Sequence, residues 1–292
     1  MKRINISTFY IIVSAALWGI TGVLTRFLGD FGFETSEIIV FRMAGAAVVL
    51  LIFMSIKNRS CFRIQLKNLL LLIGMGAISL FGTSFFYLRA VKMASLSVAA
   101  ILMYTAPFFV MIASAVLFKE KMNRNKIIAL FSAFLGCVLI SGFDGGSSMI
   151  GIVCGLMSGI TYASYTILGK YALKRCDTYT TTLWAFIFAG MISLFMIEPS
   201  ETMQKIQYAG PVAWILIASI GLLCSVLPYL FYTKGLETVP AGKASIMTTV
   251  EPMVATICGI ILFQEVPQTL AVIGIMCIVF AILLVNNFGR LE

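Results

Sequence analysis

Ten apolar runs, each about 18–23 residues long, take up most of this 292-residue chain. Each run can cross a hydrocarbon core of roughly 30 Å as a helix. Backbone groups in lipid must find their hydrogen bonds within the protein, so such a chain folds as a bundle of helices or as a closed barrel, and runs of this length select helices. We therefore expect an all-α polytopic membrane protein with ten transmembrane helices. The predicted spans are residues 9–28, 36–56, 69–91, 96–118, 126–143, 150–169, 180–197, 212–232, 242–263 and 269–287.

Two stretches of the chain match each other without a gap at a spacing of 145 residues. Segment 87–120 aligns with segment 232–265, and both stretches keep a proline inside the apolar run and a glutamate at its end. The recurring pairs are Pro107 with Pro252 and Glu120 with Glu265. A proline inside a helix costs roughly 3 kcal/mol in water, so its recurrence indicates use. Internal repeats in a hydrophobic chain are typical of transporters built from two halves.

The repeat predicts three regions along the chain. Residues 1–143 form a first five-helix repeat, residues 144–149 a linker loop, and residues 150–292 a second five-helix repeat. Because five is an odd number, the second repeat enters the membrane from the opposite side. We therefore expect two inverted repeats, with the substrate bound between them near the bilayer midplane.

Basic residues predict the orientation of the chain. With both termini in the cytoplasm (N-in/C-in), 16 of the 21 lysines and arginines fall on the cytoplasmic side, where basic loops are retained. The net charge of +9 is then a signal of topology in a multi-pass protein of the cytoplasmic (plasma) membrane. The basic residues are scattered over short loops, so nucleic acid is not an expected partner.

Two ionisable side chains are predicted to lie inside spans. Glu251 is about nine residues, or roughly 14 Å, from the cytoplasmic end of its helix, a depth that indicates a substrate or proton pathway. Alternatively, Glu251 is neutral or bonded to Thr248 or Thr249 and only stabilises a kink. Arg42 lies about six residues from the outer end of its span. Arg42 either clamps a substrate carboxylate through its paired N–H groups or has a structural role.

Pro107 and Pro252 both fall about half-way through their spans. Each would leave the carbonyl four residues earlier, on Met103 and Thr248, without its helical donor. Broken backbone at this depth is tolerated where it lines a cavity or packs within protein. We expect the two helices to be the bent elements that move during coupling or gating, although kinks satisfied by water or a neighbouring helix remain an alternative.

Aromatic side chains gather at similar depths in several spans. Trp18, Tyr104 and Tyr162 are expected near the midplane, where an aromatic cage would suit a flat apolar group or an ammonium group. Tyrosine and tryptophan also anchor proteins at the membrane interface. Tyr229 and Tyr232 are among the cavity candidates, but Tyr232 is near a span end and is expected to be such an anchor.

Several motifs together resemble the EamA-type branch of the drug/metabolite transporter (DMT) superfamily. They are Trp18-Gly19, Phe41-Arg42, Tyr-Leu-Arg-Ala at 87–90, and the repeated blocks that end at Glu120 and Glu265. The resemblance covers the whole chain. It implies a ten-helix inverted-repeat carrier of amino acids and other small metabolites, often exporting them, with spans 1, 3, 4, 6, 8 and 9 around a central cavity and spans 5 and 10 peripheral. The second half has Tyr162 and Phe186 where the first has Trp18 and Arg42, so the site should be chemically asymmetric.

These observations predict a secondary transporter that exports an amino acid or related zwitterion by alternating access. An organic cation, quaternary amine or nucleoside is the alternative cargo, and a non-transporting membrane enzyme or sensor is the alternative class. Proton coupling would run through Glu251. The expected substrate-binding residues are Trp18, Thr83, Phe86, Tyr87, Tyr104, Tyr162, Tyr165, Thr248 and Glu251, with Arg42 as clamp or structural residue and Glu251, Pro107 and Pro252 as coupling or gating residues.

The remaining features predict no further chemistry. No catalytic residue, metal site or cofactor is expected, since the chain has no histidine, no paired cysteine spacing and no Walker loop. The small-residue stripe Gly151, Gly155 and Gly159 is expected to pack within the monomer, with a dimer seam as the alternative. The expected partners are the small-molecule substrate and the lipid bilayer, around a monomer or weak homodimer.

Overall fold

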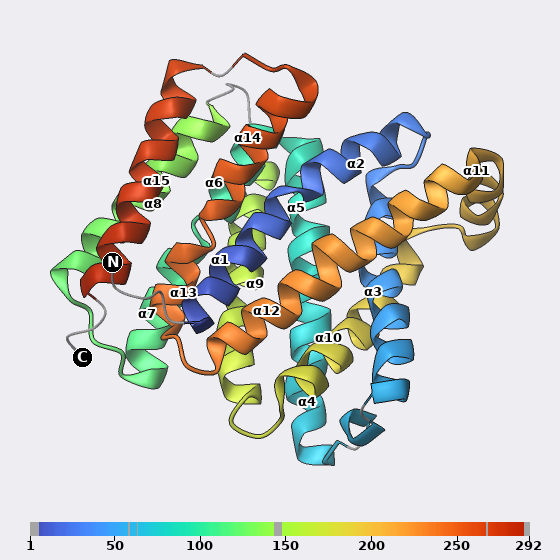
Figure 1. The fold of residues 1–292 in the computed structure, drawn as a ribbon, viewed down its shortest axis with the longest axis horizontal. Helices are drawn as coiled ribbons and strands as arrows, with labels where there is room; N and C mark the ends of the chain where they lie inside the picture. The colour runs from blue at the N-terminus through green and yellow to red at the C-terminus, as the bar shows by residue number, and fades with distance from the viewer. Residues whose placement is uncertain (1–5, 58, 63, 143–147, 267, 289–292) are drawn as a thin grey trace.

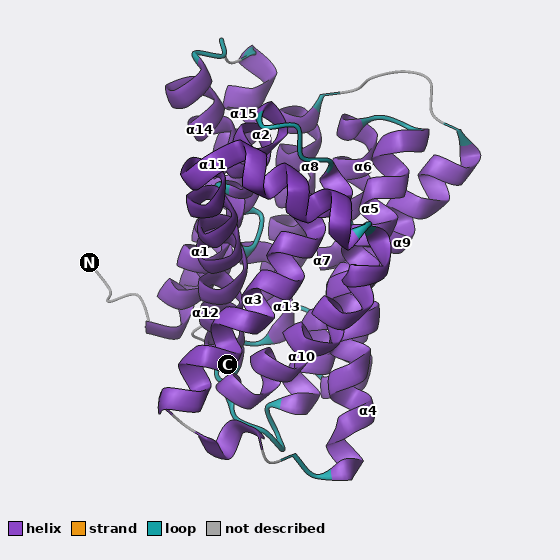
Figure 2. Cartoon of the chain, turned by 90° about the vertical axis from the view of Figure 1, so that its right-hand side faces the viewer, coloured by secondary structure: helices purple, strands orange, loops and turns teal. Residues whose placement is uncertain are grey.

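The computed structural model describes residues 6–57, 59–62, 64–142, 148–266 and 268–288. Within them the chain is a helical bundle without strands, as Figure 2 shows. The elements are α1 (Ile6–Gly19), α2 (Thr21–Asp30), α3 (Thr35–Lys57), η1 (Arg59–Phe62), α4 (Leu66–Gly74), η2 (Met75–Phe81), α5 (Gly82–Met93), α6 (Leu96–Met103), α7 (Ala106–Phe118), α8 (Arg124–Ser141), α9 (Met149–Ala172), α10 (Thr178–Ser193), η3 (Leu194–Met196), α11 (Pro199–Gly221), η4 (Leu222–Val226), α12 (Leu227–Leu236), α13 (Ala241–Met247), α14 (Val250–Phe263) and α15 (Thr269–Phe288).

Ten helices, some of them interrupted, are long and apolar enough to cross a membrane in the described part of the chain. They confirm the predicted all-α fold with ten spans. The helices run Ile6–Asp30, Thr35–Lys57, Leu66–Met93, Leu96–Phe118, Arg124–Ser141, Met149–Ala172, Thr178–Met196, Pro199–Leu236, Ala241–Phe263 and Thr269–Asn286. The predicted linker falls largely on residues 143–147, which lie outside the described residues.

The eighth span differs from the prediction, because its helix begins at Pro199 rather than near residue 212. Gly210 interrupts it with φ 74° and ψ −168°, and Pro211 follows. Glycine tolerates positive φ and proline fits the first turn of a helix, so a second helical segment starts here. The earlier segment is tied to α3, since Glu37 accepts hydrogen bonds from Thr202 Oγ1 at 2.8 Å and Lys205 Nζ at 3.0 Å.

The fifth and tenth spans, α8 and α15, pack along each other at one edge of the bundle (Figure 1). Gly136 and Gly274 make this contact close, because a Cβ on either glycine would lie 2.6–2.7 Å from the carbonyl oxygen of the other. Ser132 Oγ also donates to the Cys277 carbonyl at 2.9 Å. This placement agrees with the peripheral position that the family resemblance implies.

The small-residue stripe of α9 packs against α5 and α6 of the same chain. A Cβ added to Gly151 would lie 2.8 Å from the backbone of Met93, and one on Gly159 would lie 2.8 Å from the Leu102 carbonyl oxygen. The stripe therefore serves packing inside the monomer, as predicted.

Gly159→Ala is expected to destabilise the protein, because the new methyl group meets backbone rather than a movable side chain. The expected loss in free energy of unfolding is roughly 1–3 kcal/mol, typical of overpacking. Thermal unfolding in detergent micelles measures it. Gly45→Ala is the control, since a Cβ there has no neighbour within 4 Å; equal melting temperatures for the two variants would contradict the prediction.

Candidate functional site

The candidate site lies where three spans interrupt their helices. The first span breaks at Ile20 between α1 and α2, the fourth at residues 104–105 between α6 and α7, and the ninth at residues 248–249 between α13 and α14. Gly19 allows the end of α1 to pack closely against the start of α14, because a Cβ on Gly19 would lie 2.7 Å from the Glu251 carbonyl oxygen. Trp18 is thereby brought next to the start of α14.

The prolines begin the second half of each broken helix. Pro107 is the second residue of α7 and Pro252 the third residue of α14, positions where a missing N–H costs little. The Thr248 carbonyl is not left without a donor, since it accepts from the Glu251 N–H at 3.0 Å. Pro252 thus removes the helical donor of this carbonyl, as expected, and the N–H of Glu251 in the first turn of α14 replaces it.

An aromatic cluster surrounds Trp18. Its ring centroid lies 5.0 Å from Tyr229, 5.3 Å from Tyr232 and 6.2 Å from Tyr162, and two of the three contacts are edge-on. Such geometry is favourable beyond the burial of area alone. Tyr232 is 3% exposed and its hydroxyl lies 2.7 Å from Thr166 Oγ1, so its expected role as an interface anchor was wrong.

Glu251 stands beside this cluster in the first turn of α14 and is partly buried. Tyr162 Oη donates to Glu251 Oε2 at 3.4 Å. The sequence left open that Thr248 or Thr249 bonds the Glu251 carboxylate. Neither does, because each hydroxyl donates to a carbonyl three residues earlier at 2.7 Å. The carboxylate also interacts electrostatically with five other side chains, namely Arg42, Tyr87, Tyr104, Cys137 and Tyr229.

Arg42 therefore reaches the same region as Glu251, although the two residues belong to different spans. Arg42 also interacts with Tyr229 and Cys224, and Thr21 lies beside Cys224. Three buried atoms of this neighbourhood have no hydrogen-bond partner among the described residues: Arg42 Nε, Trp18 Nε1 and Thr21 Oγ1. Buried donors without an acceptor are rare and call for an explanation. They are suited to receive an anionic group, just as Glu251 is suited to receive a cationic one.

Of the other predicted residues, Tyr165 joins the aromatic cluster, whereas the contacts of Thr83 and Phe86 lie elsewhere. Tyr165 is buried with its hydroxyl 2.9 Å from Thr233 Oγ1, and its ring packs on Tyr229 at 5.0 Å. Thr83 donates to the Ser79 carbonyl at 2.5 Å, and Phe86 packs with Ala90 in a separate apolar cluster.

The prediction missed Thr21. It lies three residues after Trp18, hence on the same helical face, and that spacing is the signal that identifies it.

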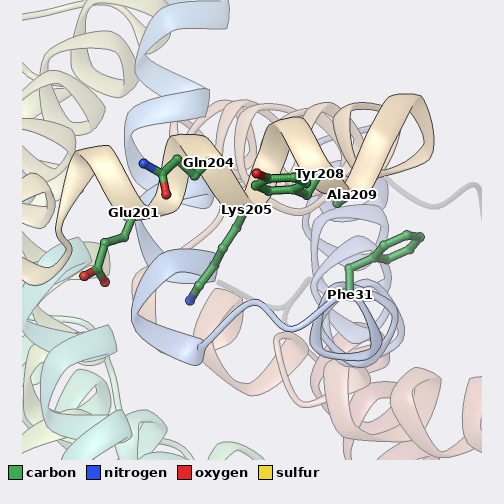
Figure 3. A pocket seen from close by; sticks show the side chains of 6 residues that line it. All are labelled: Phe31, Glu201, Gln204, Lys205, Tyr208 and Ala209. Carbon is green, nitrogen blue, oxygen red and sulfur yellow. The ribbon is translucent and has the colours of Figure 1, made fainter.

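Two pockets at the ends of the bundle are separate from this centre. One, of about 560 Å³, lies between the first half of α11 and the end of α2 (Figure 3). Its lining residues are Phe31, Glu201, Gln204, Lys205, Tyr208 and Ala209. Lys205 points away to Glu37 of α3, so its charge supports the fold. The other, of about 530 Å³, is lined by Gln65, Lys67 and Arg175.

Comparisons with known proteins agree on one family. The model of the EamA-like transporter family matches residues 5–142 and again residues 149–287. The uncharacterized transporter YyaM of Bacillus subtilis (strain 168) is 25% identical over 94% of both chains. An uncharacterized transporter of Archaeoglobus fulgidus is 29% identical over 68% of this chain and 71% of its own. A solved crystal structure of another protein has the same fold, with a TM-score of 0.81 over 98% of both chains and 16% identity.

Arg42→Met is expected to destabilise the protein, since it leaves Glu251 without its cation. The loss should stay below the roughly 3–5 kcal/mol found when one partner of a direct buried ion pair is removed. Adding Glu251→Gln should recover most of it, because the remaining charge is gone. Thermal unfolding of both single variants and the double variant measures the coupling. Additive losses would show that the two residues do not interact.

Proposed function

Because this chain belongs to the EamA-like transporter family, we propose that it is a secondary transporter that exports an amino acid or related zwitterion across the cytoplasmic membrane. The cargo binds between the two family-matched segments, at the helix breaks beside Glu251. Transport proceeds by alternating access, in which the site opens to one side of the membrane at a time.

One observation carries the proposal: a carboxylate and a guanidinium on two candidate membrane spans interact electrostatically beside a cluster of aromatic rings. Ionisable groups in spans are expensive and mark substrate or ion pathways. Glu251 supplies an acceptor for an ammonium group, which Trp18 and Tyr162 favour further through their ring faces. Arg42 supplies a guanidinium for a carboxylate, and the unpartnered donors of Trp18 and Thr21 add to it.

Local features that recur at the 145-residue spacing support an inverted repeat. The π-helical segments η2 and η4 stand at corresponding places, with residues 77–81 on residues 222–226. The helix breaks recur within one residue of this spacing, at residues 104–105 and 248–249. Figure 1 shows α7 ending at one end of the bundle and α14 ending at the other, as inverted copies require.

An organic cation or quaternary amine is the second candidate cargo. The observation that favours it is the electrostatic interaction between Arg42 and Glu251. If this interaction persists when cargo binds, the aromatic cluster alone receives the ligand, and rings of this kind prefer a cation.

Purified protein in liposomes tests the proposal. Saturable counterflow of a labelled amino acid is expected, and an excess of an unlabelled quaternary amine should not compete with it. Competition by the amine would favour the second candidate. Absence of counterflow across a broad panel of amino acids, amines and nucleosides would overturn the proposal and favour a non-transporting role.

Substitutions of Glu251 test proton coupling. If its carboxyl carries the proton, Glu251→Gln and Glu251→Ala both abolish flux driven by a pH gradient, because neither side chain titrates. Counterflow moves no net proton, so the isosteric Gln variant should keep it while the Ala variant loses it. Glu201→Gln, at the peripheral pocket, is the matched control. Full pH-driven flux through the Gln variant would show that Glu251 is not the proton carrier.

A further inference from the structure

Glu120 and Glu265, which stand 145 residues apart, follow the same unusual turn. The residues before them, Lys119 and Gln264, have φ of 55° and 54° and are the described non-glycine residues with positive φ. Each glutamate N–H then donates to a carbonyl six residues earlier, on Ser114 at 3.2 Å and on Gly259 at 3.3 Å. The backbone therefore presents both carboxylates in the same way, each at the end of a span.

Each glutamate interacts with a basic residue from the opposite half, and the aromatic residue two positions before it packs on an aromatic ring of that half. Arg26 at the end of the first span bonds Glu265 at 3.0 Å and lies 4.0 Å from the ring centroid of Phe263. At the other end, Lys170 of the sixth span interacts electrostatically with Glu120. The aromatic contacts match too, with Phe27 on Phe263 at 5.7 Å and Tyr171 on Phe118 at 5.0 Å.

The two ends differ in what the carboxylates accept. Glu120 accepts hydrogen bonds from the N–H groups of Ala241 at 2.7 Å and Gly242 at 3.1 Å, the first two residues of α13. A carboxylate at this place also stabilises the positive end of the helix. Every residue of α13 is buried, and α13 packs against α7. The chain is thus closed at this end.

The equivalent contact is not made at the other end. The counterparts of Ala241 and Gly242 are Leu96 and Ser97, the first two residues of α6, and Leu96 is 64% exposed. Ser95 Oγ caps the third N–H, of Val98, at 3.2 Å. Glu265 is turned to Arg26 instead, and α6 and α14 do not pack as α7 and α13 do. This end therefore lacks the contact that joins α7 to α13 at the other end.

We propose that Glu120 and Glu265 are alternating gates of the transport cycle. In the state described here, Glu120 closes one end by capping α13. In the opposite state, Glu265 leaves Arg26 and accepts the N–H groups of Leu96 and Ser97, while Glu120 releases α13. The inference rests on the proposed function, because it assigns the two closed ends that alternating access requires.

Pairs of spin labels at equivalent exposed sites test the gates without knowledge of the cargo. Cysteines at Lys121 and Thr238 report the end of Glu120, and cysteines at Val266 and Met93 report the end of Glu265, in a background without the seven native cysteines. Pulsed electron paramagnetic resonance of protein in lipid nanodiscs gives the distance distribution for each pair. With Glu120 and Glu265 both intact, the labelled protein should show mainly a short Lys121–Thr238 distance and a long Val266–Met93 distance.

Glu120→Gln should shift the ratio of the two states roughly tenfold toward closure at the other end, since it removes a charge-assisted cap. Glu265→Gln should shift the ratio in the opposite direction and leave only the state described here. Arg26→Gln frees Glu265 and should act like Glu120→Gln. Arg26→Gln and Glu265→Gln, which remove the two partners of one ion pair, should therefore shift the ratio in opposite directions. If the ion pair were only structural, the two substitutions would have the same effect. Glu201→Gln is the control.

Two results would overturn the gates: unchanged distances in Glu120→Gln, or shifts in the same direction for Glu120→Gln and Glu265→Gln. Opposite shifts without any counterflow in liposomes would support the gates and refute the proposed cargo. Counterflow together with unchanged distances would support the proposed cargo and refute the gates.

Discussion

Backbone groups in a membrane must find partners inside the protein, and the whole site depends on this constraint. The chain interrupts its helices at several points and supplies partners at each. In η2, the carbonyl of Ser79 accepts a hydrogen bond from Thr83 Oγ1 of α5. The Ser79 side-chain hydroxyl lies 2.6 Å from Ser164 Oγ. At the third break, the Glu251 N–H satisfies the Thr248 carbonyl. Irregular backbone is thus buried against other helices, where polar side chains can accompany it.

Charge follows from the same constraint. Glu251 and Arg42 are tolerated inside spans because each has the other and a set of tyrosines nearby. Tyr162 supplies a hydroxyl donor and a large apolar ring at once. Among the described residues, the buried donors near this pair that have no hydrogen-bond partner lie on Trp18, Thr21 and Arg42, in the first two spans, and a further such hydroxyl lies on Thr181. The asymmetry between an acid from one half and a guanidinium from the other suits a cargo with two unlike ends.

Sequence reasoning predicted the spans well, because hydrophobic length alone decides whether a helix can cross a membrane. It also singled out Glu251 and Trp18 as site candidates, since an acid and a tryptophan at that depth are rare in any span. It did not locate the helix breaks, because a proline marks a boundary only to within a turn and the break falls before it. The burial of Tyr232 was missed for a related reason: the helix of the eighth span is longer than its apolar core. Contacts between spans far apart in the sequence, such as Trp18 with Tyr229, leave no local pattern.

The contact between α8 and α15 joins the last span of each half. Gly136 and Gly274 bring the two backbones together with little side chain between them. Ile278 lies against Gly136 and Ile140 lies against Gly274, so a side chain of each helix fills the hollow at the glycine of the other. The pair lies at one edge of the bundle (Figure 1), and Cys137, next to Gly136, interacts electrostatically with Glu251. Two helices that interlock in this way move as one unit, so the last spans of the two halves are tied together at this edge.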